Sequence, residues 1–94
     1  MQTITVPGKN SKHRVLLYAL STCIWCKRVK SFLRENGIEY DFFDVDLHGE
    51  KEREEVTADI LRRGGRLSYP TIIIDGEMLI TGFKEDKLRE VLEI

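Results

Sequence analysis

The chain has 94 residues, 41% of them hydrophobic and 33% charged, with a formal net charge of −1. A chain of this length and mixture is typical of one soluble globular domain that buries a core without disulfide staples. The charge balance provides no positive field to attract phosphates, so the composition argues against a nucleic-acid partner.

The longest apolar run, Val15 to Leu20, is far shorter than the ~20 residues that cross a bilayer. Residues 1–10 lack the apolar stretch of a secretory signal. We therefore expect a cytoplasmic protein that does not enter the membrane.

The chain opens with an alternating segment, Thr3 to Val6, which Pro7 and Gly8 interrupt. This pattern predicts either an extra edge strand or a mobile arm for residues 1–13. The main domain is expected over residues 14–94.

The first main element is Val15–Leu20, whose nearly continuous apolar residues are typical of a central strand covered on both faces. Ser21 and Thr22 are N-cap candidates for a helix over Lys27–Arg34. This helix carries one apolar stripe, and an Asn-Gly pair shortly after it is a typical end signal.

The rest of the chain alternates strands and helices, which gives the order β-α-β-α-β-β-α. A second strand rich in aromatic residues precedes a charged, weakly amphipathic helix that two glycines end. A β-branched strand then leads through an Asp-Gly hairpin signal into a last strand and a last helix. The predicted ranges are Ile38–Val45, Glu50–Arg63, Thr71–Ile74, Met78–Ile80 and Glu85–Ile94.

Both cysteines of the chain, Cys23 and Cys26, lie between the first strand and the first helix. Residues three apart on a helix have Cβ atoms roughly 5–6 Å apart, so small rotations make or break a disulfide between them. At a helix start, unpaired backbone N–H groups and the helix dipole favour the thiolate form of Cys23. The pair is predicted to be redox-active, with metal binding and inert thiols as the alternatives.

The two histidines, His13 and His48, invite a zinc interpretation of the cysteine pair. They are far apart in the chain and lack the short spacing of paired zinc-binding histidines. No glycine-rich nucleotide motif is present either. We expect no metal site and no cofactor, so that electrons arrive from another protein or from a small thiol.

The element order, the Cys-Ile-Trp-Cys motif after the first strand and Tyr69-Pro70 before the hairpin resemble the glutaredoxin branch of the thioredoxin fold. The resemblance covers about residues 14–94, and Gly82 adds to its specificity. It implies an α/β three-layer sandwich with a four-stranded mixed sheet, strand order 2-1-3-4, and three helices. In that fold the proline matching Pro70 is cis and faces the cysteine pair.

Several positions depart from the glutathione-using members, which carry an upstream lysine, Cys-Pro-Tyr-Cys, Thr-Val-Pro and a Gly-Gly pair. Leu20 replaces the lysine, which removes a cation for the glutathione carboxylate. Phe83 replaces the second glycine and crowds backbone that a glycine leaves open. Arg66 and Asp86 still match positions that contact glutathione in the family.

A Gly-Phe pair at this place is similar to redoxins of the NrdH type, which take electrons from thioredoxin reductase and reduce ribonucleotide reductase. The resemblance thus implies a monomeric thiol–disulfide oxidoreductase in which Cys23 attacks a substrate disulfide and Cys26 resolves the mixed disulfide. The residues expected to contact the substrate are Thr22, Ile24, Trp25, Arg66, Tyr69, Pro70, Gly82, Phe83 and Asp86.

Two alternatives remain open from the sequence. The first is a glutathione-dependent glutaredoxin, in which glutathione replaces the flavin-dependent disulfide reductase as electron donor. The second is a metal or iron–sulfur cluster carrier that uses the same two thiols. In the preferred interpretation the partners are protein disulfides and the reductase.

Overall fold

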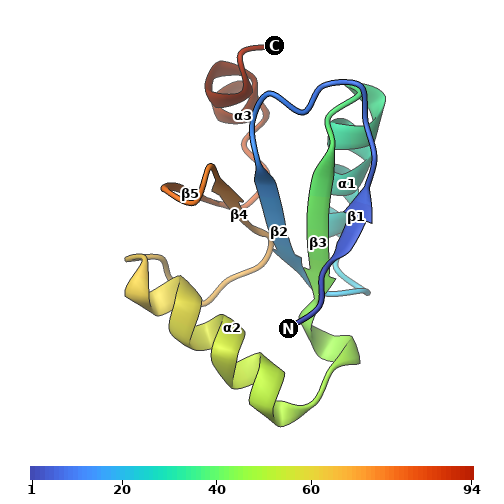
Figure 1. Ribbon diagram of the computed structural model, residues 1–94. Helices are drawn as coiled ribbons and strands as arrows, with labels where there is room; N and C mark the ends of the chain where they lie inside the picture. The colour runs from blue at the N-terminus through green and yellow to red at the C-terminus, as the bar shows by residue number, and fades with distance from the viewer.

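The structure is a computed structural model that describes all 94 residues. Its helices and strands follow the predicted order, with one additional strand near the N-terminus (Figure 1). The strands are β1 (Ile4–Val6), β2 (Val15–Ala19), β3 (Tyr40–Asp44), β4 (Thr71–Ile74) and β5 (Met78–Thr81). The helices are α1 (Ile24–Glu35), α2 (Glu50–Arg62), α3 (Glu85–Leu92) and a short 3₁₀ turn, η1 (Val45–Leu47).

The strands form one mixed sheet in the order β1-β3-β2-β4-β5. Strand β2 is parallel to β3 and antiparallel to β4, and β5 is antiparallel to β4. The predicted order of the four main strands and the fold class are therefore confirmed. The sheet has five strands instead of the expected four because β1 adds to the edge of β3, antiparallel, with Ile4 opposite Phe42.

The continuous apolar character of β2 follows from burial on both faces of the sheet. Successive strand residues point to opposite faces: Leu17 and Ala19 belong to the core under α1 and α3, whereas Tyr18 belongs to the core under α2. Full burial of a Leu, Ile or Val side chain contributes about 1.5–3 kcal/mol. Helices thus cover both faces, and the three layers hold the central strand in place.

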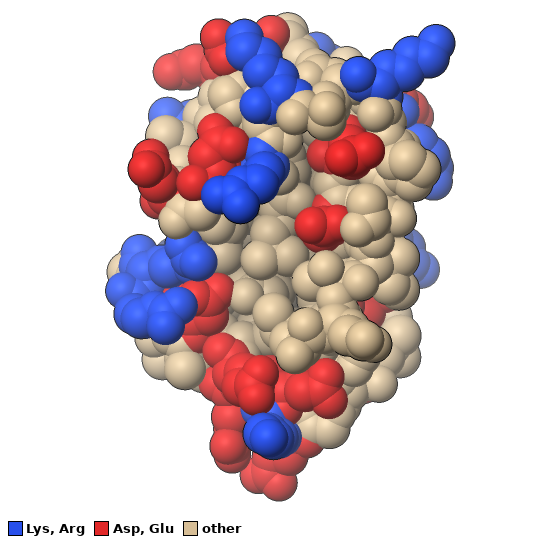
Figure 2. All heavy atoms as spheres, in the orientation of Figure 1, with Lys and Arg blue, Asp and Glu red and all other residues tan.

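Helices α1 and α2 bury the stripes that their sequences predict. Helix α1 buries Val29, Phe32 and Leu33, and α2 buries Val56 and Ile60. The exposed side of α2 is strongly charged: Figure 2 shows acidic side chains gathered over the N-terminal part of α2 and basic side chains over its C-terminal end. No helix has the length and apolar character that a membrane span requires.

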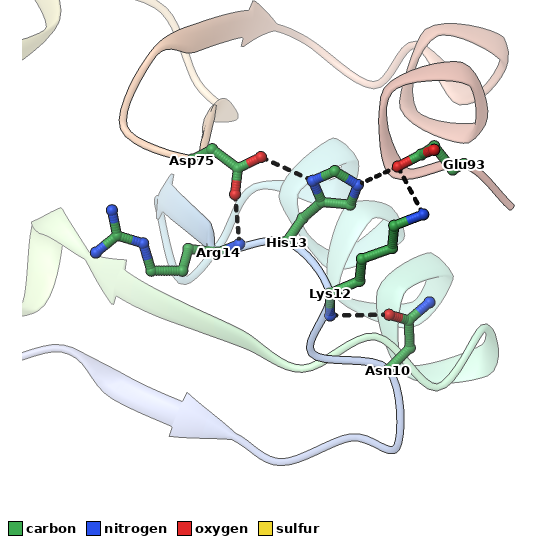
Figure 3. A network of polar contacts seen from close by, with 6 residues as sticks. All are labelled: Asn10, Lys12, His13, Arg14, Asp75 and Glu93. Atoms are coloured by element: carbon green, nitrogen blue, oxygen red, sulfur yellow. Dashed lines mark hydrogen bonds and ion pairs between the residues drawn. The ribbon is translucent and has the colours of Figure 1, made fainter.

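A polar network ties three segments together at the start of β2 (Figure 3). The His13 ring lies between two carboxylates, with Nδ1 2.7 Å from Asp75 Oδ2 and Nε2 2.8 Å from Glu93 Oε2. Asp75 lies in the β4–β5 turn and also accepts a 2.9 Å hydrogen bond from the backbone N–H of Arg14. Lys12 pairs with the same Glu93 oxygen at 2.9 Å. The network therefore joins the N-terminal segment, the hairpin and the end of α3.

Candidate functional site

Cys23 lies at the boundary between the turn after β2 and helix α1, where it is the N-cap residue with extended backbone angles. Its Sγ accepts a 3.2 Å hydrogen bond from the backbone N–H of Cys26. The predicted position of Cys23 at the helix start is confirmed, but the expectation that Ser21 or Thr22 caps the helix is wrong. A sulfur at this position faces N–H groups that have no partner within the helix, an environment that stabilises negative charge.

Cys26 lies one turn into α1 and is fully buried, whereas Cys23 is partly exposed. Both thiols are free. Burial, followed by the hydrogen bond that the Cys26 thiol donates to the Cys23 sulfur, raises the pKa of Cys26 to about 12. The two sulfurs therefore differ: one meets solvent at a helix N-terminus, and the other is kept protonated beneath it.

The turn that precedes Cys23 is fixed by Asp46, which lies in η1. The Asp46 carboxylate accepts a 2.7 Å hydrogen bond from the backbone N–H of Ser21 and a 2.5 Å bond from its hydroxyl. The hydrogen bond from the Ser21 hydroxyl, followed by the bond from the Ser21 backbone N–H, lowers the pKa of Asp46. The N–H of Cys23 donates to the Leu20 carbonyl at 3.1 Å and closes the turn.

Opposite the cysteines, the Tyr69–Pro70 peptide bond is cis, as the resemblance implied. The Gly82 N–H donates to the Pro70 carbonyl at 2.8 Å, with Gly82 at a φ of 83° that favours glycine. Burial and then the neighbouring Cys26 raise the pKa of Tyr69. Tyr69 and Cys23 both pack against the core cluster that contains Cys26.

A hollow of about 240 Å³ opens beside the cysteine motif. Its lining residues come from three separate parts of the chain: Trp25, Tyr69, Pro70, Gly82 and Phe83. Because the hollow adjoins the Cys23 turn, a disulfide that reaches the exposed thiol would lie over this lining. The hollow carries no charged side chain, so it suits uncharged polypeptide backbone and apolar side chains.

Two apolar side chains that follow Cys23 in the chain are exposed; Trp25 lines this hollow, whereas Ile24 lines a different one. Ile24 is 62% exposed and Trp25 is 53% exposed, and the guanidinium of Arg28 lies 5.0 Å from the centre of the Trp25 ring. Trp25 therefore stands on the surface next to a cation and is not folded into the core. Phe83 is anchored by an edge-on contact with the buried Phe32 at 5.7 Å between ring centres.

Not every predicted site residue lies at this hollow. Thr22 is exposed on the turn, and Asp86 is exposed in the first turn of α3, outside the lining residues. Arg66 lines a different, neighbouring hollow. No group of three or more His, Cys, Asp or Glu side chains with metal-binding geometry is present.

The contact between Ser21 and Asp46 has no counterpart among the residues predicted from the sequence. The two residues are far apart in the chain, and the only local signal was that Asp46 follows a strand. The parallel pairing of β2 with β3, in which Ala19 lies opposite Asp44, brings the ends of both strands to one edge of the sheet. A contact of this kind becomes predictable only once that register is known.

The comparisons with known proteins agree with this geometry. The family model for glutaredoxin matches residues 15–79. The chain is 34% identical over 80 residues to an uncharacterized glutaredoxin-like 8.6 kDa protein of Clostridium pasteurianum, covering 84% of this chain and 97% of the relative.

Solved structures resemble the chain over most of its length. The glutaredoxin from Methanosarcina mazei has a TM-score of 0.88 and 38% identity, covering 100% of this chain and 90% of its own. The methanoredoxin of Methanosarcina acetivorans has a TM-score of 0.81 and 37% identity, covering 86% of this chain and 85% of its own.

Proposed function

The chain belongs to the glutaredoxin family of thiol–disulfide oxidoreductases, and from this premise we propose that it reduces protein disulfides through Cys23 and Cys26. We further propose that a flavin-dependent reductase of the thioredoxin-reductase type, and not glutathione, supplies the electrons. The observation that carries the dithiol assignment is the pairing of a partly exposed Cys23 sulfur, hydrogen-bonded by the helix N-terminus, with a buried Cys26 thiol.

The first step is attack of the Cys23 thiolate on one sulfur of the substrate disulfide. A Cys23–substrate disulfide forms, the substrate S–S bond breaks, and the other substrate sulfur leaves as a thiolate that takes up a proton. The exposed position of Cys23 and the uncharged hollow beside it support this step, since the incoming chain has to pack close to the sulfur.

The second step is attack of Cys26 on the Cys23 sulfur of the mixed disulfide. Cys26 loses its proton, the Cys23–Cys26 disulfide forms, and the second substrate sulfur leaves and is protonated. Burial is the main cause of the raised pKa of Cys26, and the hydrogen bond to Cys23 and the negative charge of Cys23 add to it. The added contribution of that charge is lost when Cys23 is bound to the substrate. Formation of the mixed disulfide thus makes the resolving thiol easier to ionise.

The oxidised pair then needs two electrons and two protons to regenerate both thiols. Two features favour a protein reductase as their source. Leu20 provides no cation beside the cysteine motif for a glutathione carboxylate. The Phe83 ring lines the hollow beside Pro70 and occupies space there. By the same resemblance, we propose a ribonucleotide reductase disulfide as one substrate.

A coupled assay tests the electron donor. Reduction of a protein disulfide is followed with NADPH and thioredoxin reductase, and in parallel with NADPH, glutathione reductase and glutathione. We expect faster turnover with the first system. Equal or faster turnover with glutathione would establish the glutathione-dependent alternative instead.

Single-cysteine variants test the roles of the two thiols. Cys23→Ser is expected to abolish disulfide reduction in both systems, whereas Cys26→Ser is expected to accumulate a mixed disulfide visible by mass spectrometry. Activity retained by Cys23→Ser would refute the proposed nucleophile. A matched control is Ser31→Ala, a change of one oxygen on the same helix outside the cysteine motif.

A further inference from the structure

A second surface hollow lies next to the cysteine site and differs from it in chemistry. Its volume is about 570 Å³. Its lining residues are Gly64, Gly65, Arg66, Leu79, Ile80, Thr81, Lys84 and Lys87. They come from the end of α2, from strand β5 and from the start of α3, so the hollow lies over the edge of the sheet between these two helices.

The charges that line this hollow all have one sign. Arg66, Lys84 and Lys87 are its only ionisable lining residues, and none of the three forms an ion pair. Three other hollows on the surface mix acidic and basic side chains. Because the whole chain has a net charge of −1, this basic lining is a local feature and not the result of a basic protein.

The hollow is continuous with the cysteine site along the chain. Thr81 and Lys84 line the basic hollow, and the two residues between them, Gly82 and Phe83, line the uncharged hollow beside the cysteine motif. A polypeptide whose disulfide lies at Cys23 and which continues past Phe83 therefore enters the basic hollow next.

The backbone at the floor of the hollow is also open to a partner. Strand β5 is the last strand of the sheet and pairs only with β4, so its outer edge presents unpaired backbone groups. Such an edge accepts an extended chain through backbone hydrogen bonds. Leu79 and Thr81 of this strand line the hollow.

We propose that this basic hollow binds an acidic segment of the substrate protein, next in sequence to the disulfide that Cys23 attacks. The proposal rests on the proposed function and names the class of substrate: proteins with Asp or Glu residues flanking the reducible cysteine. Carboxylates are the complement of the lining, since a guanidinium binds them in a bidentate manner and lysines attract them as point charges. If the substrate segment binds in an extended conformation along β5, its successive side chains point alternately toward the α2 side and the α3 side of the hollow.

Short disulfide-bonded peptides with matched sequences test this assignment. One peptide carries three Glu residues beside its cysteine, a second carries Gln at the same positions, and a third carries Lys. We expect kcat/KM to be about tenfold higher for the Glu peptide than for the Gln peptide at low salt, the combined effect of a few exposed ion pairs. The Lys peptide is expected to be slowest, and the preference is expected to shrink at high salt because exposed charges are screened.

Reversing the charge of two lysines in the hollow tests whether the lining causes the preference for the Glu peptide. In the double variant Lys84→Glu and Lys87→Glu, the order of the Glu and Lys peptides is expected to invert. Lys51→Glu, an exposed lysine at the other end of α2, has the same change of charge per residue and is expected to keep the wild-type order. A small uncharged disulfide, bis(2-hydroxyethyl) disulfide, is expected to be reduced equally by all three proteins.

The outcomes separate the two proposals. If wild-type protein reduces none of the disulfides, the proposed function fails. If it reduces the Glu and Gln peptides equally well, the acidic-segment proposal is overturned and the proposed function stands. If the double variant changes only the KM for glutathione and leaves the peptide preference intact, the hollow belongs to glutathione, which also overturns the proposal.

Discussion

The Asp46 carboxylate holds Ser21 by both its backbone N–H, at 2.7 Å, and its hydroxyl, at 2.5 Å. Ser21 lies two residues before Cys23, and the turn between them carries no other side-chain hydrogen bond. The 3₁₀ turn η1, which follows β3, therefore fixes the loop that presents the partly exposed Cys23 thiol. Asp46 is a positioning residue in this arrangement and touches neither sulfur.

Asp46→Ala removes both acceptors at once. We expect kcat/KM for protein disulfides to fall by about tenfold, within the roughly 100-fold loss that a small misplacement of a reacting group produces. Because the effect acts through geometry, Asp46→Asn, which retains one carbonyl acceptor, is expected to recover part of the rate. Glu54→Ala, an exposed acid on α2, is the control, and a loss of the same size in it would contradict the positioning role.

The buried resolving thiol predicts a specific pH dependence for chemical labelling. In a Cys23→Ser variant the main cause of the raised pKa, burial, remains, while the influence of the Cys23 thiol is gone. The rate of alkylation of Cys26 by iodoacetamide is therefore expected to keep rising beyond pH 9, the ordinary value for this group. The same variant unfolded in guanidinium is expected to reach its plateau near that ordinary value. A folded-state plateau at or below pH 9 would contradict the burial argument.

Phe83 is expected to limit the use of glutathione. Phe83→Gly removes a ring that lines the hollow beside Pro70, so the KM for glutathione in the coupled assay is expected to fall. The change also removes the edge-on contact with Phe32, worth about 0.5–1.5 kcal/mol beyond the burial of the ring, so the melting temperature is expected to fall as well. Phe83→Leu keeps apolar bulk and is expected to retain the wild-type KM. An unchanged KM in the glycine variant would show that Phe83 does not obstruct glutathione.

The network around His13 predicts how stability changes with pH. Hydrogen bonds with Asp75 and Glu93 raise the pKa of His13, and a raised histidine pKa stabilises the fold fully below the unfolded value of about 6.5 and loses that effect as pH rises through the folded value. The lowered pKa values of Asp75 and Glu93 act in the opposite direction: their stabilisation is present above the ordinary carboxyl range and is lost in acid.

Unfolding by urea at several pH values measures this window. The free energy of unfolding is expected to be highest between about pH 4.5 and 6.5, where the carboxylates are ionised and the imidazole is protonated. His13→Gln is expected to lose the decline above about pH 6.5, whereas Lys9→Gln, a change at an exposed residue of the same N-terminal segment, is expected to keep it. If the free energy of unfolding of His13→Gln still falls with rising pH as it does in the wild type, another titrating group causes the fall.

The sequence by itself determined the fold class and the position of the cysteine motif. The hydrophobic pattern predicted the helices and strands because each pattern is local. The apolar run of Val15–Leu20 and the apolar stripe of α1 contain residues that the structure buries in its core. The Cys-x-x-Cys spacing likewise carries its chemistry within one helical turn, so Cys23 and Cys26 required no tertiary information.

Only the tertiary structure decided which distant residues surround those thiols. It placed Asp46 on Ser21 and brought Arg66 together with Lys84 and Lys87 in a basic hollow. It also made Cys23 itself the helix cap. These relationships depend on how strands distant in the sequence pair and on how the helices pack against the sheet, which no single local segment specifies.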